Sequence, residues 1–532
     1  MAELTDDPGK WTRRERLIDW LTLIFVVMVS AWLFSAALRH RPTVMRYLED
    51  DFFYYAKVAT NIVAGRGSTF DGTTPTNGYH PLYLLVLLPA AWVKSGLTSF
   101  LVELWLLAVA AATITFAFAR RIFRAVRCEP LLANGLGLLA LWLPVRMFFQ
   151  CMEVTLTIPL AMALLWLFVA MLSEEKVSTS RAGWAGLVAV LMVLSRLDSA
   201  LLVLLLLIAV LAEPGLRAKL TGRAVTAFAI AAGVPLLSYL ASNHVWFGTW
   251  MPVSGMAKQL RFSHMPSRIA LHSAWFGKGK LLLAMAVVAL AGWFLLWRRL
   301  RPEWRAVLLA AILLPLVQIG VFCILSDWQM WGWYHYAFTP ALLALFVLLA
   351  FWWNHSESYP RWSQMAGVGA LLLGGALTAT NHWKTDPEMA QIGDAAEQLR
   401  EFATTHPGTY AMGDRSGMVA WSSSQPLFQT EGLVEDRAWV ETIRSQQDLA
   451  SALRGRGVRY YVTTEWEGAA PGFVPAIFVP AGCTVAVEPM QAGPTAPHLQ
   501  SVFCSAPVAA IKIPAEQGFP AKRVLVFDLK SN

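Results

Sequence analysis

The chain has 532 residues, of which 56% are hydrophobic and only 15% are charged, and its mean hydropathy is +0.49. This composition excludes an ordinary soluble protein and indicates several membrane-spanning helices. The net charge of +8 does not indicate binding to nucleic acid, because the basic residues cluster directly after apolar segments, as in cytoplasmic loops, and no nucleic-acid-binding motif accompanies them.

Eleven membrane crossings are predicted from the apolar segments of the first 380 residues. A bilayer core about 30 Å thick requires about 20 helical residues, so the shorter segments must be tilted or extended by aromatic residues. The segment Pro81–Val93 is too short and is expected to lie at the interface. The predicted crossings are Trp20–Leu38, Phe100–Phe118, Leu131–Phe149, Val154–Leu172, the two halves of Ala182–Leu211, Val225–Ala241, Leu281–Trp297, Ala306–Leu325, Pro340–Trp353 and Met365–Thr380.

The polar run Ser195–Ser199 divides Ala182–Leu211 into two short helices in this prediction. Two helices keep the basic residues on both flanks on one side of the membrane, as the positive-inside rule prefers, whereas a single helix would separate them. We therefore expect a multi-pass protein of the cytoplasmic membrane, with its N-terminus inside and its C-terminal domain outside.

The segment from Glu49 to Tyr83 is the most informative part of the chain. It begins with three consecutive carboxylates, which cannot face lipid and must face water or a polar cavity. Asp50 and Asp51 could act as a general base toward a hydroxyl, or bind a divalent cation through oxygen. The alternative is an interfacial acidic pair that orients the end of the first helix.

The same loop offers side chains that could bind a sugar or an acceptor. The aromatic residues Tyr54 and Tyr55 could wall a sugar pocket or simply anchor an interfacial helix. Asn77 offers an amide group. His80 is held extended by the proline that follows it, and could face a phosphate or cap the next helix.

Further polar residues lie in or beside the later apolar segments. Glu153 and Arg196 are ionisable groups within apolar runs, which indicates a functional site, although Arg196 could instead simply pair with Asp198. Lys258 could contact a phosphate as a point charge or be an ordinary solvated lysine. His335 lies in an aromatic-rich run, which could be a sugar- or isoprenoid-binding wall or an aromatic belt.

Residues 381–532 have the composition of a soluble α/β domain. Cys483 and Cys504 both lie in it, and an external location permits a disulfide between them, the alternative being two buried free thiols. The expected strands are Tyr410–Met412, Val458–Thr463, Ala476–Val479, Thr484–Val487 and Arg523–Phe527, and the expected helices are Asp386–Phe402 and Ala438–Leu453.

The motifs of the first loop resemble those of the polytopic GT-C glycosyltransferases, in particular the bacterial relatives of the mycobacterial terminal arabinofuranosyltransferases. The shared pattern is an acidic pair after the first helix, Tyr-x-x-x-Ala-x-Asn, Gly-x-Gly and Thr-Asn-Gly-Tyr-His-Pro-Leu. Further matches follow in Met152–Leu156, Leu194–Asp198 and Phe247–Pro252, and the C-terminal domain matches only loosely. The sequence departs from the family pattern at Cys151, where relatives often have Gly, and at Leu197, where Pro is usual.

The resemblance implies a GT-C-like polytopic α-helical membrane protein of about eleven transmembrane helices in residues 1–380, with a first external loop at 39–99 and an extracytoplasmic α/β domain at 381–532. It implies a cell-envelope enzyme that moves a sugar, arabinofuranose or another pentose or hexose, from a polyprenyl-phosphate donor to a glycan, protein or lipid acceptor with inversion. No cofactor is implied with certainty, and a divalent cation on the first-loop carboxylates is compatible with the pattern.

The family's roles carry over to individual residues of this chain. Asp51, or Asp50 beside it, would deprotonate the acceptor hydroxyl, and Asp51 is favoured because the spacing to Tyr55 fits it better. Glu153, with Tyr54, Tyr55, Asn77 and His80, would bind the acceptor or the sugar, and Arg196, Lys258 and His335 would bind the donor phosphate, whose negative charge rises as it leaves.

A transporter or flippase of a polyprenyl-linked glycan is the alternative function, because it would also place charges in a membrane cavity. The sequence shows neither an inverted repeat nor repeated broken-helix pairs, which are typical of transporters. A transporter needs no general base, so substitution of Asp51 separates the two functions.

Overall fold

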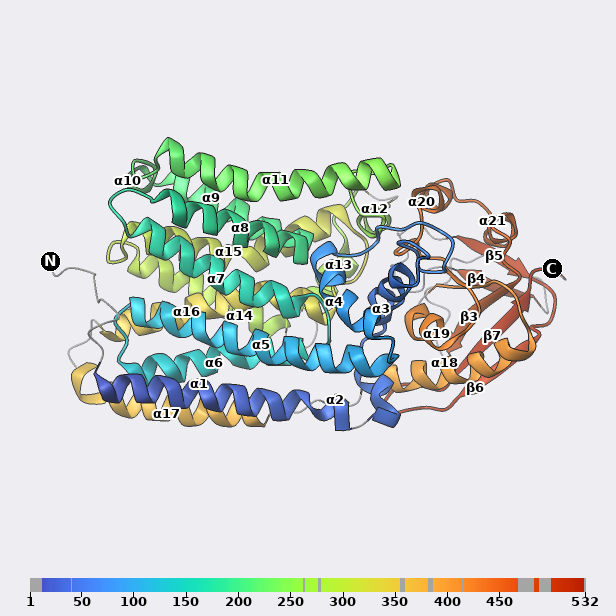
Figure 1. The fold of residues 1–532 in the computed structure, drawn as a ribbon, viewed down its shortest axis with the longest axis horizontal. Helices are drawn as coiled ribbons and strands as arrows, with labels where there is room; N and C mark the ends of the chain where they lie inside the picture. Colours follow the sequence, from blue (N-terminus) through green and yellow to red (C-terminus); the bar gives the residue numbers. More distant parts are fainter. Residues whose placement is uncertain are drawn as a thin grey trace.

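The computed structural model consists of a long helical bundle and a sheet-containing domain that covers one of its ends (Figure 1). It describes residues 12–39, 41–261, 264–275, 279–354, 359–380, 386–413, 415–466, 483–487 and 499–530.

Eleven apolar helices of the described residues form the bundle, in agreement with the predicted crossings. Eight stretches are long and apolar enough to cross a membrane, and the last of them combines a 3₁₀ helix, Gly332–Ala337, with α16. The long helices are α1 (Arg13–Phe34), α5 (Leu97–Ala125), α6 (Pro130–Phe148), α7 (Val154–Leu172), α11 (Gly222–Phe247), α14 (Gly279–Leu296), α15 (Pro302–Leu325) and α16 (Phe338–Asn354). The others are α8 (Thr179–Ser195), α9 (Ala200–Ala212) and α17 (Tyr359–Ala379).

The predicted break between α8 and α9 is confirmed. Arg196 has an extended backbone, and a short 3₁₀ turn, Leu197–Ser199, separates the two helices. The guanidinium of Arg196 lies 2.8 Å from the carboxylate of Asp198. Two charged residues at the tip of a helical hairpin can pair with each other there, whereas within one continuous spanning helix they would meet lipid.

The helix α4 (Pro81–Val93) has 13 residues. At a rise of about 1.5 Å per residue it spans roughly 20 Å, which is less than the hydrocarbon core of a bilayer. It packs against α3 (Asp50–Val63), α5 and α8. Its length agrees with the prediction that it does not cross the membrane.

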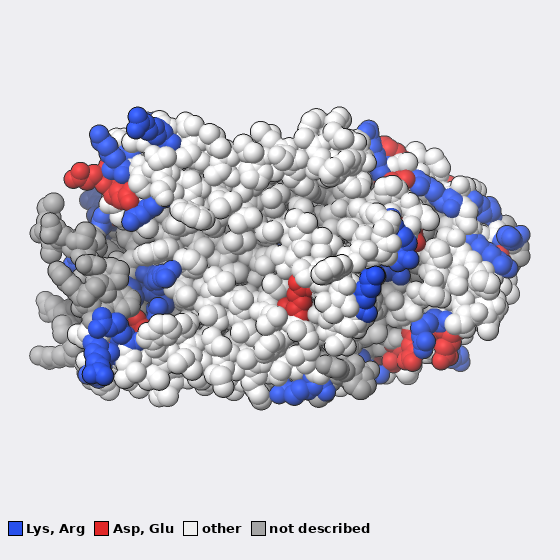
Figure 2. All heavy atoms as spheres, in the orientation of Figure 1, with Lys and Arg blue, Asp and Glu red and all other residues white. Residues whose placement is uncertain are grey.

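The basic loops between the membrane helices and the first loop, which contains α3, lie at opposite ends of the bundle (Figure 1). The connections around α10 (Pro214–Arg217) lie at one end of the bundle, and α3, α12 (Val253–Lys258) and the sheet domain lie at the other (Figure 1). Charged side chains gather at both ends, with few over the middle of the helical region (Figure 2). This distribution agrees with a bundle whose middle lies in lipid.

Labelling with a membrane-impermeant thiol reagent tests the predicted orientation. Arg121→Cys, in an exposed position near the end of α5, is expected to remain unlabelled in intact cells, and Arg400→Cys, on α18 (Pro387–Thr405), is expected to react, because the positive-inside rule places the basic loops in the cytoplasm. Permeabilised cells, in which both positions must react, provide the control. Equal labelling in intact cells would contradict this topology.

The C-terminal part contains a five-stranded mixed sheet in the order β2-β1-β3-β7-β6. The strand β1 is parallel to both of its neighbours, and β7 is antiparallel to both of its neighbours. The strands are β1 (Tyr410–Met412), β2 (Leu427–Gln429), β3 (Tyr460–Trp466), β6 (Ala509–Ile513) and β7 (Lys522–Asp528), and the helices are α18, α19 (Ser416–Ser422), α20 (Arg437–Arg444) and α21 (Leu449–Gly455).

The structure differs from one predicted helix of this domain and does not describe one predicted strand. The single helix expected over Ala438–Leu453 is wrong, because α20 ends near Gln446, which has φ +53°, and Asp448 accepts a hydrogen bond from the amide of Ser451 to cap a new helix, α21. The expected strand Ala476–Val479 and the first residues of the predicted domain, 381–385, lie outside the described residues.

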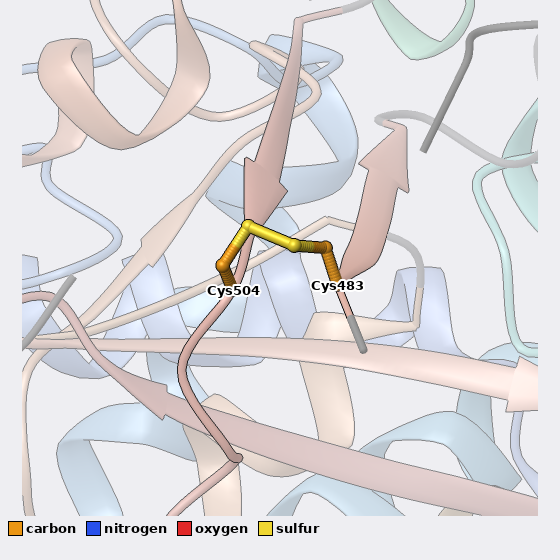
Figure 3. The surroundings of a disulfide bond; sticks show 2 residues. All are labelled: Cys483 and Cys504. Carbon is orange, nitrogen blue, oxygen red and sulfur yellow. A yellow bond between two sulfur atoms is a disulfide. The ribbon is translucent and has the colours of Figure 1, made fainter. Parts of the chain in front are cut away.

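A disulfide joins Cys483 and Cys504 (Figure 3). The two cysteines directly flank the antiparallel strands β4 (Thr484–Val487) and β5 (Gln500–Phe503), which form a separate two-stranded sheet. A cross-link that closes a loop with a sequence separation of 21 residues restricts the unfolded chain and contributes about 3 kcal/mol in the chain-entropy model.

Candidate active site

The two sides of α3 face different partners. The helix begins at Asp50 after Glu49, whose backbone is extended. Residues spaced by three and four lie on one face of a helix, and Asp51, Tyr55 and Val58 therefore point together into a cavity of about 60 Å³. The cavity is lined by Asp51, Tyr54, Tyr55, Val58, Gly78, Tyr79, His80, Met152, Glu153, Arg196, Ser254, Lys258, Trp333, Tyr334, Leu433 and Val434.

Asp51 presents a half-buried carboxylate to this cavity. Within the described residues, no hydrogen-bond donor contacts that carboxylate. Burial raises the pKa of Asp51, and the nearby cations Lys258 and Arg415 partly oppose this rise. A carboxylate whose pKa is raised in this way is a better proton acceptor than an ordinary solvated aspartate.

Lys258, at the end of α12, brings a positive charge to the same cavity. Its ammonium group donates to the hydroxyl of Tyr334 at 3.4 Å and lies 6.0 Å from the centre of the Trp328 ring. Burial lowers the pKa of Lys258, but Tyr334 and Asp51 outweigh this effect and the net shift is upward. The side chain therefore stays charged, and two of its three N–H donors remain for a ligand.

Arg196 and Glu153, which also line the cavity, form a buried ion pair. The guanidinium of Arg196 also pairs with Asp198, and its centre lies 4.3 Å from the centre of the Tyr334 ring. The hydroxyl of Tyr55 donates to the second oxygen of Glu153 at 3.4 Å. Arg196 is thus already balanced by two carboxylates, whereas no carboxylate of the described residues lies within hydrogen-bond distance of the Lys258 ammonium.

His80 lies beside this ion pair in its neutral form. Burial and the charge of Arg196 lower the pKa of His80 to about 3. Its Nδ1 accepts a hydrogen bond from the amide of Leu197 at 3.4 Å, which leaves the proton on Nε2, 3.9 Å from Glu153. In this tautomer the Nε2–H of His80 points toward the carboxylate of Glu153.

The neighbouring carboxylate, Asp50, points away from the cavity. It is completely buried, and its two oxygens accept hydrogen bonds from the amides of Gly417 at 2.9 Å and Met418 at 2.7 Å. Burial raises the pKa of Asp50 to about 6, against the effect of these two hydrogen bonds. Glu49, before the helix, also has a pKa raised by burial, to about 8.

The structure brings seven of the predicted site residues together around one cavity: Asp51, Tyr54, Tyr55, His80, Glu153, Arg196 and Lys258. The predicted residues Asp50, Asn77 and His335 are not among those that line it. Asn77 instead braces a loop, since its side-chain oxygen accepts from the amide of Val253 at 3.0 Å and its amide donates to Thr249 at 3.3 Å. The Nε2 of His335 is buried and has no hydrogen-bond partner among the described residues.

Several lining residues were not predicted. The aromatic-rich run around His335 was recognised, but it is Trp333 and Tyr334 that reach the cavity. Leu433 and Val434 belong to the C-terminal domain, and no local sequence signal places them at a membrane cavity. Their loop packs so closely on Gly78 that a Cβ atom there would lie 1.8 Å from the carbonyl oxygen of Leu433.

Each carboxylate that lines the cavity interacts with a positive side chain, and a divalent cation bound there stays a prediction. No group of three His, Cys, Asp or Glu residues suited to a metal ion occurs in the part of the chain that the structure describes. Of the two carboxylates that line the cavity, Glu153 is neutralised by Arg196, and Asp51 lies within the electrostatic influence of Lys258. A cation would have to compete with both positive side chains.

Comparison with known proteins shows the fold. No protein-family model matches the sequence, and no curated protein matches it. The structure of ArnT from Cupriavidus metallidurans bound to undecaprenyl phosphate matches with a TM-score of 0.54 at 14% identity, over 91% of this chain and 98% of that one. The apo structure of the same protein gives 0.54 and 14% over 92% and 98%. An Archaeoglobus fulgidus oligosaccharyltransferase in the apo form gives 0.47 and 12% over 84% and 69%. The chain therefore has the fold of ArnT along almost its whole length, and the predicted GT-C-like fold class is confirmed.

Proposed function

We propose that the protein is a membrane glycosyltransferase that moves a sugar from a polyprenyl-phosphate donor to a hydroxyl group of an acceptor at the outer face of the membrane. The observation that carries the proposal is the cavity that Asp51, free of hydrogen-bond donors among the described residues, lines together with the charged side chain of Lys258. The undecaprenyl phosphate bound to ArnT, which has the same fold, supports a lipid-linked donor.

The chemistry requires a proton acceptor and a stabilised leaving group. The acceptor oxygen attacks the anomeric carbon and loses its proton to the carboxylate of Asp51, while the bond from that carbon to the phosphate oxygen breaks. Attack opposite the leaving phosphate inverts the configuration at the anomeric carbon. Negative charge grows on the departing polyprenyl phosphate, and the N–H donors of Lys258 stabilise it.

The other side chains divide between the two substrates. Arg196 is held in place by its ion pairs with Glu153 and Asp198. Its charge is therefore already balanced, and it offers the donor phosphate a guanidinium group of fixed orientation. Glu153, Tyr55 and neutral His80 offer acceptors and donors to hydroxyl groups of the sugar or acceptor. The rings of Trp333 and Tyr334, which lie nearly parallel with an interplanar angle of 28°, offer apolar faces to the sugar.

The direct test uses the purified protein in lipid nanodiscs with a panel of polyprenyl-phosphate sugars, beginning with arabinofuranose. A transferase is expected to release polyprenyl phosphate only when an acceptor is present, and the product is expected to have the inverted anomeric configuration. Movement of a labelled donor across vesicle membranes without such release would instead support the transporter.

Lys258→Gln is expected to weaken the binding of undecaprenyl phosphate about 10- to 100-fold, because a charge-assisted hydrogen bond to a phosphate contributes about 1.5–3 kcal/mol. Lys258→Arg, which keeps the charge, is expected to bind more tightly than Lys258→Gln. Titration calorimetry in nanodiscs measures both affinities. The matched control is Lys512→Gln, which removes an exposed lysine of β6 and should leave the affinity unchanged. Wild-type affinity in Lys258→Gln would contradict the assignment of Lys258 to the donor phosphate.

A further inference from the structure

The side of α3 next to its cavity face is occupied by the C-terminal domain. Asp50, Tyr54 and Lys57 are spaced by four and three residues and lie along this side of the helix. All three make polar contacts with residues of α19. The helix that carries Asp51 is therefore held between the cavity and α19.

Three residues of α3, one per turn, make four polar contacts in this attachment. The Asp50 carboxylate accepts hydrogen bonds from two amides in the first turn of α19, those of Gly417 and Met418. The hydroxyls of Tyr54 and Ser416 lie 3.2 Å apart. The ammonium of Lys57 donates to the carbonyl oxygen of Ala420 at 2.6 Å.

The backbone of α19 also approaches the start of α3 closely at Gly417. A Cβ atom on Gly417 would lie 2.4 Å from the backbone oxygen and 2.9 Å from a carboxylate oxygen of Asp50. The rings of Phe53 and Trp421 lie 6.1 Å apart between centres. A substitution that adds one methyl group at position 417 must therefore push α19 away from the start of α3.

We propose that Asp50 is a positioning residue, through which α19 fixes the first turn of α3 and so the carboxylate of Asp51. This proposal rests on the proposed function. The first turn of a helix is the part most prone to fray, and Glu49 provides no side-chain cap to α3. A displacement of about 1 Å at a reacting group can lower a rate about 100-fold, so a loose first turn would reduce catalysis even with every cavity residue in place.

The test compares Gly417→Ala, Asp50→Ala and Asp50→Asn with the wild-type protein in nanodiscs. Gly417→Ala and Asp50→Ala are expected to lower kcat about 10- to 100-fold, because Asp51 is no longer held. The affinity for undecaprenyl phosphate should stay within about twofold of wild type, since Lys258 is untouched. Asp50→Asn keeps one carbonyl acceptor for the two amides and should retain more activity than Asp50→Ala.

A second measurement does not depend on turnover. Hydrogen exchange of the first turn of α3 is expected to accelerate in Gly417→Ala and in Asp50→Ala. Gly455→Ala is the matched control, because a Cβ atom on that glycine of α21 meets no atom within 4 Å, and it should change neither exchange nor kcat.

The possible results separate this inference from the proposed function. If Asp51→Asn abolishes transfer while Gly417→Ala and Asp50→Ala keep wild-type kcat and wild-type exchange, the function stands and the positioning role is overturned. If the wild-type protein transfers no sugar, the proposed function fails, and unchanged exchange in both variants would still overturn the role of Asp50. Equal losses of kcat and of donor affinity would indicate general unfolding of the site and would also overturn it.

Discussion

Asp51→Asn is expected to lower the rate of sugar transfer by at least 100-fold and by up to about 10,000-fold. The amide is almost isosteric with the carboxylate but cannot accept the proton of the acceptor hydroxyl, and general-base assistance is worth roughly 10²–10⁴ in rate. The release of labelled polyprenyl phosphate from a synthetic donor, measured under saturating acceptor, gives kcat directly. Binding of undecaprenyl phosphate should persist, because Lys258 remains in the cavity.

The control for Asp51→Asn removes a carboxylate elsewhere. Glu397→Gln lies on α18 with a side chain that is 69% exposed, and it should leave both kcat and thermal stability unchanged. Near-wild-type transfer by Asp51→Asn, with an intact fold, would show that Asp51 is not the base.

Gly78→Ala is expected to lower both stability and activity, with a loss of about 1–3 kcal/mol in the free energy of unfolding from overpacking and at least a tenfold loss in kcat. The added Cβ would lie 1.8 Å from the oxygen of Leu433 and 3.0 Å from the Cα of Val434, so the loop that forms one wall of the cavity must move. Thermal unfolding in nanodiscs and the transfer assay measure the two effects.

Gly255→Ala serves as the matched glycine control for Gly78→Ala. Gly255 lies in α12 beside the cavity-lining Ser254, and a Cβ atom there would lie 3.6 Å from the side chain of Met251, an ordinary contact. It should behave as wild type. Equal stability of Gly78→Ala and Gly255→Ala would indicate that the loop of the C-terminal domain does not pack on Gly78 as the structure shows.

The membrane helices could be predicted from the sequence because hydropathy reports directly on contact with lipid. The break at Arg196 was predictable because the polar run Ser195–Ser199 interrupts the apolar segment, and because two helices keep the basic flanks on one side of the membrane. Within the C-terminal domain, the sequence predicts one helix where the structure has two, α20 and α21. The helical spacing of apolar residues continues across Gln446, although that residue has a left-handed backbone. Only the backbone conformation reveals that interruption.

The spacing to Tyr55 in the family pattern favours Asp51 over Asp50, but the local sequence does not show which of the two carboxylates faces a cavity. They are adjacent acids, and their side chains leave the helix about 100° apart. Asp50 is buried because it binds the amides of α19, and Gly417 of that helix lies 367 residues further along the chain. Leu433 illustrates the same limit, because an apolar residue in a soluble domain gives no sign that its carbonyl lies against Gly78 of the first loop.

The hydrogen bond between Asp50 and Gly417 also sets the order in which the protein can be completed during synthesis. Ribosomes add about 5–20 residues per second, so the 367 residues between the two partners take roughly 20–70 s to make. The first helices are threaded into the bilayer during this interval, while the Asp50 carboxylate lacks the amides of Gly417 and Met418 that later donate hydrogen bonds to it. A nascent chain therefore cannot complete the attachment of the first turn of α3, or the cavity that Leu433 and Val434 help to line, until α19 and the residues after it have been synthesised and folded.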